Sequence, residues 1–401
     1  MSEDDGLEYE PVSVKEVLGE MKDIAELLID LSYSSVLFEN PELAEEVLAL
    51  EDEMDLLQLQ ARMSLVMAGR RPEEAEALAP VFGIVGAAEK ISDAAGDIAK
   101  VVLEDIGLPP ALRGALPEAV ETLARATVSA DSPYADRTLG DINLETETGV
   151  RVLALRRDDE WILNPSRETR LQTEDVLFCR GAEEGLTRVY EAVTGGRYTP
   201  PKTVEQPIED LDRAVETVAL MKNMSELAVD LAYGSVLFDS PELAKEVREL
   251  EVEVDALQSR FEVWALRAAE TVDDSVSIRG LLHIATSTEV ISDAALEISE
   301  GVLRGVGSHP VVEAAVQESD EIIYRTTVTS GSRLDGTTIS DSEVKTRTGM
   351  HIVAIRRESA EDNGRTKYQI SPLPDTTLRA GDVLITKGTR AGAERLSDWA
   401  A

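Results

Sequence analysis

Residues 21–47 read MKDIAELLIDLSYSSVLFENPELAEEV, and residues 221–247 read MKNMSELAVDLAYGSVLFDSPELAKEV. Continued by ten residues, the two stretches share 22 of 37 residues without a gap. The same offset of 200 residues relates 89–93 and 149–157 to their copies later in the chain. Chance does not maintain one offset over such a distance, so the chain is a tandem duplication.

Each repeat begins with a helical part. In the first repeat, apolar residues recur at helical spacing over 13–38. Asn40 is a typical N-cap residue, and the proline after it starts a second helix that ends near Ala68. A third helix follows, and a shorter fourth reaches about Arg125. The pattern predicts an antiparallel helical bundle.

After Arg125 the hydrophobic period changes from helical to alternating. Four strand patterns are predicted, together with one helical turn at 139–142 and a closing helix at 183–193; the strands are 126–129, 150–155, 161–163 and 175–178. The fold class is therefore α+β, with two antiparallel helical bundles alternating with two small α+β domains. We place the first bundle at 1–125, the first small domain at 126–197, a linker at 198–207, the second bundle at 208–325 and the second small domain at 326–401.

The net charge of −39 limits the classes of partner. So acidic a surface repels nucleic acid, which we exclude as a partner, and it suits a halophilic cytoplasm. The single cysteine, Cys179, fits a reducing compartment. The N-terminal residues lack a signal-peptide pattern, and no stretch is long and apolar enough to span a bilayer. We expect a cytoplasmic protein that reaches a membrane only through a partner.

Paired carboxylates are the candidate metal ligands. The spacing Glu-x-x-x-Asp occurs three times in each helical part, at Glu26/Asp30, Glu51/Asp55 and Glu89/Asp93, then at Glu226/Asp230, Glu251/Asp255 and Glu289/Asp293. Carboxylates four residues apart on a helix repel each other, and a bound cation relieves that repulsion. Oxygen ligands favour Mg²⁺, Ca²⁺ or Mn²⁺. We assign a metal to the 26/30 and 89/93 pairs and their copies; the alternative is that these acids are solvated.

The helical part resembles the PhoU family, named for regulators of phosphate uptake. The resemblance is carried by EKISDAAGDI at 89–98, which is similar to the family signature Glu-Arg-Ile-Gly/Ala-Asp-x-Ala-x-Asn-Ile. The chain has Asp97 and Glu297 where the family has Asn, which puts the third ligand of a metal site in doubt. The resemblance implies Fe³⁺ or Zn²⁺ as further candidate metals.

The small domain resembles the C-terminal domain of TrkA/RCK proteins, the cytosolic regulators of potassium channels and transporters. The matching residues are TGVRVLALRR at 148–157, Asn164-Pro165 and DVL at 175–177, with 348–357 and 373–384 in the second copy. The resemblance implies an anionic ligand such as a cyclic dinucleotide, with Arg156, Asn164 and Arg356 as candidate contacts. No Gly-x-Gly-x-x-Gly follows a strand, so NAD is not expected.

These observations favour a regulator over an enzyme. The leading hypothesis is a regulator of cation transport, with potassium as the ion, a membrane channel or transporter subunit as the partner, and a homo-oligomer as the assembly. The first alternative is a regulator of phosphate uptake with a carboxylate-bound metal. The second is a metal-dependent hydrolase, which has little support because no nucleophile elbow or phosphate loop occurs.

Overall fold

The structure is a computed structural model. It describes residues 14–68, 72–109, 122–144, 148–158, 160–163, 165–181, 183–198, 208–237, 239–272, 276, 278–304, 322–358, 366–370, 372, 375–388 and 390–401. The linker assigned to 198–207 lies almost wholly outside these residues, as does Asn164.

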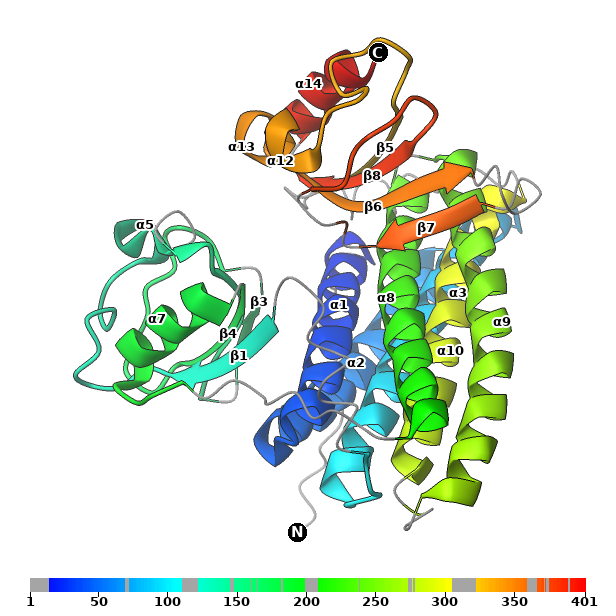
Figure 1. The fold of residues 1–401 in the computed structure, drawn as a ribbon. Helices are drawn as coiled ribbons and strands as arrows, with labels where there is room; N and C mark the ends of the chain where they lie inside the picture. The colour runs from blue at the N-terminus through cyan, green and yellow to red at the C-terminus, as the bar shows by residue number, and fades with distance from the viewer. Residues whose placement is uncertain are drawn as a thin grey trace.

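Six long helices form the body of the molecule (Figure 1). The first repeat contributes α1 (Val14–Phe38), α2 (Pro41–Ala68) and α3 (Pro72–Leu103), and the second contributes α8 (Glu209–Leu237), α9 (Pro241–Thr271) and α10 (Ile278–Leu303). The predicted N-cap of α2 is confirmed, because the Asn40 side chain accepts hydrogen bonds from the backbone amides of Glu42 and Leu43 at 2.9 and 3.2 Å. Ser240 caps α9 in the same way.

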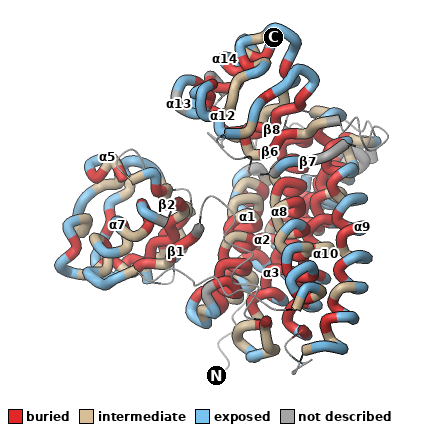
Figure 2. The backbone as a smooth tube through the Cα atoms, in the orientation of Figure 1, coloured by how far each residue is buried: buried red, intermediate tan, exposed pale blue. Residues whose placement is uncertain are grey.

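Each repeat packs its three helices on one another, and α3 then packs against α10. The buried residues line the facing sides of all six helices (Figure 2). They form one continuous hydrophobic core that contains residues of both repeats, for example Ile24, Ile91, Leu231 and Ile291. The two bundles therefore share a core, and neither is an independent unit.

Each small domain is a four-stranded antiparallel sheet with helices on its outer face. The first sheet has the order β1-β4-β2-β3, and the second has the order β5-β8-β6-β7. The elements of the first are β1 (Thr122–Thr127), α5 (Leu139–Ile142), β2 (Arg151–Arg157), β3 (Glu160–Leu163), β4 (Val176–Gly181) and α7 (Glu183–Thr194). Those of the second are β5 (Ile322–Thr327), α12 (Ile339–Ser342), α13 (Val344–Thr348), β6 (Met350–Glu358), β7 (Thr366–Ile370), β8 (Val383–Gly388) and α14 (Arg390–Ala400).

Alternation along the strands places each sheet between two cores. On β4, Val176 and Phe178 face the helices and join their core, whereas Leu177 and Cys179 belong to a separate core with α7. The second sheet is divided in the same way between the bundle and a third core. Both small domains are thereby packed against the bundle through apolar side chains.

The end of one predicted helix was placed wrongly. The fourth helix was to reach Arg125, but 122–125 belong to strand β1, whose residues pair with β4 from Thr122 onward. The rest of that predicted helix lies outside the described residues. Cross-strand pairing outweighs the helical preference of Leu123 and Ala124. The small domains therefore begin at or before 122 and 322, ahead of the expected 126 and 326.

Candidate metal centre

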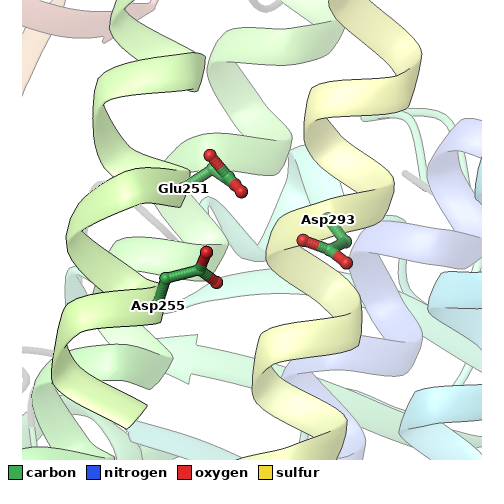
Figure 3. A group of neighbouring side chains, drawn as sticks. All are labelled: Glu251, Asp255 and Asp293. Carbon is green, nitrogen blue, oxygen red and sulfur yellow. The ribbon is translucent and has the colours of Figure 1, made fainter. Parts of the chain in front are cut away.

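Three carboxylates of the second repeat converge between α9 and α10 (Figure 3). Glu251 and Asp255 lie one turn apart on the same side of α9, and Asp293 faces them from α10. One oxygen atom from each residue lies within 4.8 Å of the others. We call these three residues the acidic group. Its ligand atoms are all oxygen, which is the set that Mg²⁺, Ca²⁺ and Mn²⁺ prefer.

The electrostatics of the acidic group favour a cation. Burial raises the pKa of Glu251, and the charges of Asp255 and Asp293 raise it further. Burial followed by Asp255 and Glu297 raises the pKa of Asp293, and Lys90 of α3 offsets part of that rise. The pKa of the nearby Glu289 is raised by burial and then by all three members of the group. Each carboxylate thus makes its neighbours harder to ionise, and a divalent ion would reverse that effect.

The corresponding residues of the first repeat have protein cations as neighbours. Arg62 lies 3.1 Å from Glu89, and Lys100 lies 3.6 Å from Glu51. At the equivalent positions of the second repeat, the sequence has Glu262 and Glu300. Both copies therefore have the carboxylates, but where the first has two neutralising cations the second has acids.

A glycine explains the position of Glu51. A Cβ atom built on Gly96 would lie 2.1 Å from Oε2 of Glu51, so this side chain occupies the space above the glycine, on the way to Lys100. The second repeat has Leu296 at the equivalent position, where its side chain takes the place of the open space above the glycine. Glu251 is thus left with Asp255 and Asp293 as neighbours, which accounts for the acidic group in the second repeat.

The first predicted pair of each repeat is engaged by cations. Glu26 lies 2.8 Å from Lys22, and Asp30 lies 3.1 Å from Arg180 of the first sheet. Burial raises the pKa of Glu26, but Lys22 and other cations outweigh it and the pKa falls. In the second repeat Lys222 contacts Glu226 at 2.6 Å and Lys387 contacts Asp230 at 3.5 Å. A metal ion at these pairs would have to displace four protein cations.

The predicted ligand arginines connect the sheets to the bundle. Arg156 donates from Nε and Nη2 to the two carboxylate oxygens of Glu46 on α2, both at 2.7 Å. Arg125 of β1 approaches the same carboxylate at 3.5 Å. The Glu46 side chain is 7% exposed, so this is a mostly buried, bidentate ion pair.

The second repeat has a related contact, in which Arg325 donates a hydrogen bond to Glu246 and Arg356 forms an ion pair with it. The Nε atoms of Arg356 and Arg325 lie 2.9 and 3.3 Å from Oε1 of Glu246 on α9, and Tyr368 donates its hydroxyl to the other oxygen. We call the two sets, Glu46 with its arginines and Glu246 with its arginines and tyrosine, the bundle–sheet clamps. An anion that bound Arg156 or Arg356 would compete with a carboxylate of the bundle.

The neighbouring arginines pair with acids of their own small domain. Arg157 donates to both oxygens of Asp175 at 2.8 Å, and Arg357 contacts both oxygens of Asp382 at 2.6 Å. Each aspartate is 1% exposed and also accepts a backbone amide. The sequence did not identify Glu46 as the partner of Arg156, although the two residues recur together at the 200-residue offset.

Family models match both parts of each repeat. The model of the PhoU domain matches residues 18–102 and 218–302, and that of the TrkA-C domain matches 123–194 and 323–401. The chain contains two PhoU domains and two TrkA-C domains. The three long helices of each repeat are thus a PhoU domain, and each four-stranded sheet with its helices is a TrkA-C domain.

One curated relative is similar over a short stretch. Probable potassium channel protein 2 of Methanocaldococcus jannaschii is 36% identical over 64 residues, which are 16% of this chain and 19% of that protein. The chain therefore matches about a fifth of that relative, and the activity of the whole relative does not transfer to it.

Two solved structures are similar at low identity. PhoU from Pseudomonas aeruginosa is 13% identical with a TM-score of 0.41, covering 73% of this chain and 96% of that one. The GsuK channel bound to NAD is 17% identical with a TM-score of 0.18, covering 70% and 52%. Because both TM-scores are low, the domain assignment rests on the family models. None of the helices in the described residues has the length and apolar character needed to cross a bilayer.

Proposed function

We propose that this protein regulates potassium transport from the cytoplasmic side, with the TrkA-C domains as sensors and the PhoU domains as the part that contacts a membrane channel or transporter. Both domain families are regulatory and non-catalytic. The potassium channel relative supports potassium as the ion. The observation that carries the proposal is the pair of bundle–sheet clamps, because they tie each TrkA-C sheet to a PhoU helix through a mostly buried carboxylate.

The clamps supply a physical route from sensing to response. A ligand changes an equilibrium only if it binds one state better than another. An anionic ligand, for which a cyclic dinucleotide is our candidate, would pair with Arg156 or Arg356 in the state where Glu46 or Glu246 has been released. The ligand would thereby favour a looser arrangement of sheet and bundle. Charges from both TrkA-C domains, Arg151 and Lys387, also act on Glu26 of α1.

Potassium uptake in a deletion strain tests the proposal. Strains complemented with the wild type, with Glu46→Gln/Glu246→Gln, or with Glu300→Gln as an exposed-carboxylate control are grown under potassium limitation. We expect deletion to change the rate of potassium uptake. In the clamp variant the rate should no longer respond to the ligand concentration, and in the control it should respond as in wild type. Uptake that is the same with and without the gene would refute the proposal.

The acidic group favours a second candidate function, a metal-dependent regulator of phosphate uptake. Here the PhoU domain of the second repeat would hold a divalent ion through Glu251, Asp255 and Asp293. We expect one tightly bound Mn²⁺ per chain by calorimetry, and none in Asp293→Asn. Arg62→Glu/Lys100→Glu gives the first repeat the residues that the second has at these two positions, and it should raise the number of bound Mn²⁺ ions per chain toward two. Phosphate uptake that does not respond to deletion would refute this function while leaving metal binding to be measured separately.

A further inference from the structure

The first repeat exposes a line of apolar side chains along the C-terminal half of α2. Each member after the first lies three or four residues beyond another member, so all lie on one side of the helix; they are Leu56, Leu59, Met63, Val66 and Met67. Their exposed fractions run from 39% for Leu59 to 69% for Val66. We call these five residues the apolar stripe. Phe82 of the adjacent α3 is exposed as well.

The second repeat lacks a continuous stripe. Val263 and Leu266 are exposed at the positions of Met63 and Val66. However, the positions of Leu56, Leu59 and Met67 are taken by Ala256, Ser259 and Arg267. Arg267 also lies 5.1 Å from the ring of Trp264, which it partly covers. The exposed apolar line is therefore continuous on α2 and interrupted on α9.

Charge selects the kind of partner. Helix α2 has seven acidic residues and a single basic one, and the acids Asp52, Glu53 and Asp55 lie directly before the stripe. A second copy of this chain would bring another charge of −39 to the contact. Two segments outside the described residues, 1–13 and 305–321, have acidic residues and no lysine or arginine, so they offer no complement either.

We propose that the apolar stripe binds an amphipathic helix whose polar side is rich in lysine and arginine, presented by the membrane partner. The inference of a membrane partner rests on the proposed function. Segments next to membrane spans on the cytoplasmic side have an excess of lysine and arginine, so such a helix is available on a channel or transporter. Apolar anchors at the same three- and four-residue spacing enter between the side chains of the stripe, and methionines adapt to them. The basic residues pair with Asp52, Glu53 and Asp55.

Binding of a synthetic helix made only of leucine and lysine tests the proposal with the full chain. A scrambled peptide of the same composition and a leucine–glutamate helix are the peptide controls. The stripe variant is Met63→Gln/Val66→Gln, and the matched control is Val263→Gln/Leu266→Gln at the same positions of the second repeat. All four substitutions are at exposed residues and leave the charge unchanged.

We expect fluorescence anisotropy to show binding of the leucine–lysine helix that is weaker at higher salt. The stripe variant should bind roughly tenfold more weakly, or about 1.4 kcal/mol, and the matched control should bind as wild type. Absence of binding, equal binding of the scrambled peptide, or equal loss in both variants would overturn the proposal.

Sedimentation tests the other candidate for binding to the stripe, a second copy of this chain. Self-association that is lost in the stripe variant and retained in the matched control would assign the stripe to a second copy of the chain and overturn the proposal. The peptide result does not depend on potassium uptake, so failure of this inference and failure of the proposed function are separate outcomes.

Discussion

Replacement of Glu246 by alanine should detach or loosen the second TrkA-C domain. The Glu246 side chain is 4% exposed and holds Arg356 and Arg325, which are 18% and 25% exposed, together with the hydroxyl of Tyr368. Its removal would leave two arginines of like charge close together and partly buried, without their counter-ion.

Removing one partner of a buried ion pair destabilises a protein by about 3–5 kcal/mol. Water still reaches part of both arginines, so we expect a value near the lower limit, about 3 kcal/mol. This corresponds to roughly a hundredfold faster opening of the β5–β8 sheet. Hydrogen exchange followed by mass spectrometry on peptides of that sheet measures the change. Glu246→Gln keeps the shape of the side chain and one hydrogen-bond acceptor, so its rate of hydrogen exchange should lie between those of wild type and Glu246→Ala.

Glu300→Ala provides the control, because Glu300 forms an exposed ion pair with Arg304, the residue after the end of α10. Its loss should cost less than about 0.5 kcal/mol. If Glu246→Ala accelerated exchange no more than this control, the clamps would not hold the sheet on the bundle, and the proposed route from sensor to bundle would be wrong.

Three further predictions concern single side chains. Tyr33 shares a buried hydrogen bond of 2.7 Å with Thr288, so Tyr33→Phe should lower the free energy of unfolding, measured by urea titration, by about 1 kcal/mol. The buried hydroxyl of Tyr233 has no hydrogen-bond partner among the described residues, so Tyr233→Phe should show no loss of stability in the same titration. Burial raises the pKa of Cys179 to about 12, so its thiol should react with iodoacetamide only after the first TrkA-C domain unfolds, as mass spectrometry of pulse-labelled protein would show; rapid labelling of native protein would contradict this. Burial and then neighbouring carboxylates raise the pKa of Asp293, so the folded chain holds that proton more tightly than the unfolded chain. Metal-free protein should therefore melt at a higher temperature as the pH falls through the raised pKa, and Asp293→Asn should show a weaker dependence in thermal melts with EDTA, because burial still raises the pKa of Glu251 and Glu289.

Much of the fold could be predicted from local patterns. The helix over 13–38, the cap at Asn40 and the strand at 161–163 follow from periodicity and capping, and the structure confirms them with shifts of a residue or so. Strand β1 was missed in part because Leu123 and Ala124 favour helices, and only their pairing with β4 makes them extended. That pairing joins residues far apart in the sequence, so no local pattern indicates it.

The candidate site was predicted less completely. The sequence identifies carboxylate pairs, but the packing of α9 on α10 decides which of them meet, and it brings Asp293 to Glu251 and Asp255. The contact of Lys22 with Glu26 could have been anticipated from their four-residue spacing. The contact of Arg180 with Asp30 spans 150 residues and could not. The sequence did contain one signal for the acidic group: Glu262 and Glu300 stand in the second repeat where the first has Arg62 and Lys100.

The shared hydrophobic core has a consequence for how the two halves can diverge. In a dimer of identical chains every substitution is imposed on both sites at once, and dilution separates the subunits. Here the halves are covalently linked, so their contact persists at any concentration and each half can accumulate its own changes. A charged ligand site can then evolve in one half while an apolar binding surface evolves in the other, and the shared core fixes the position of one half relative to the other.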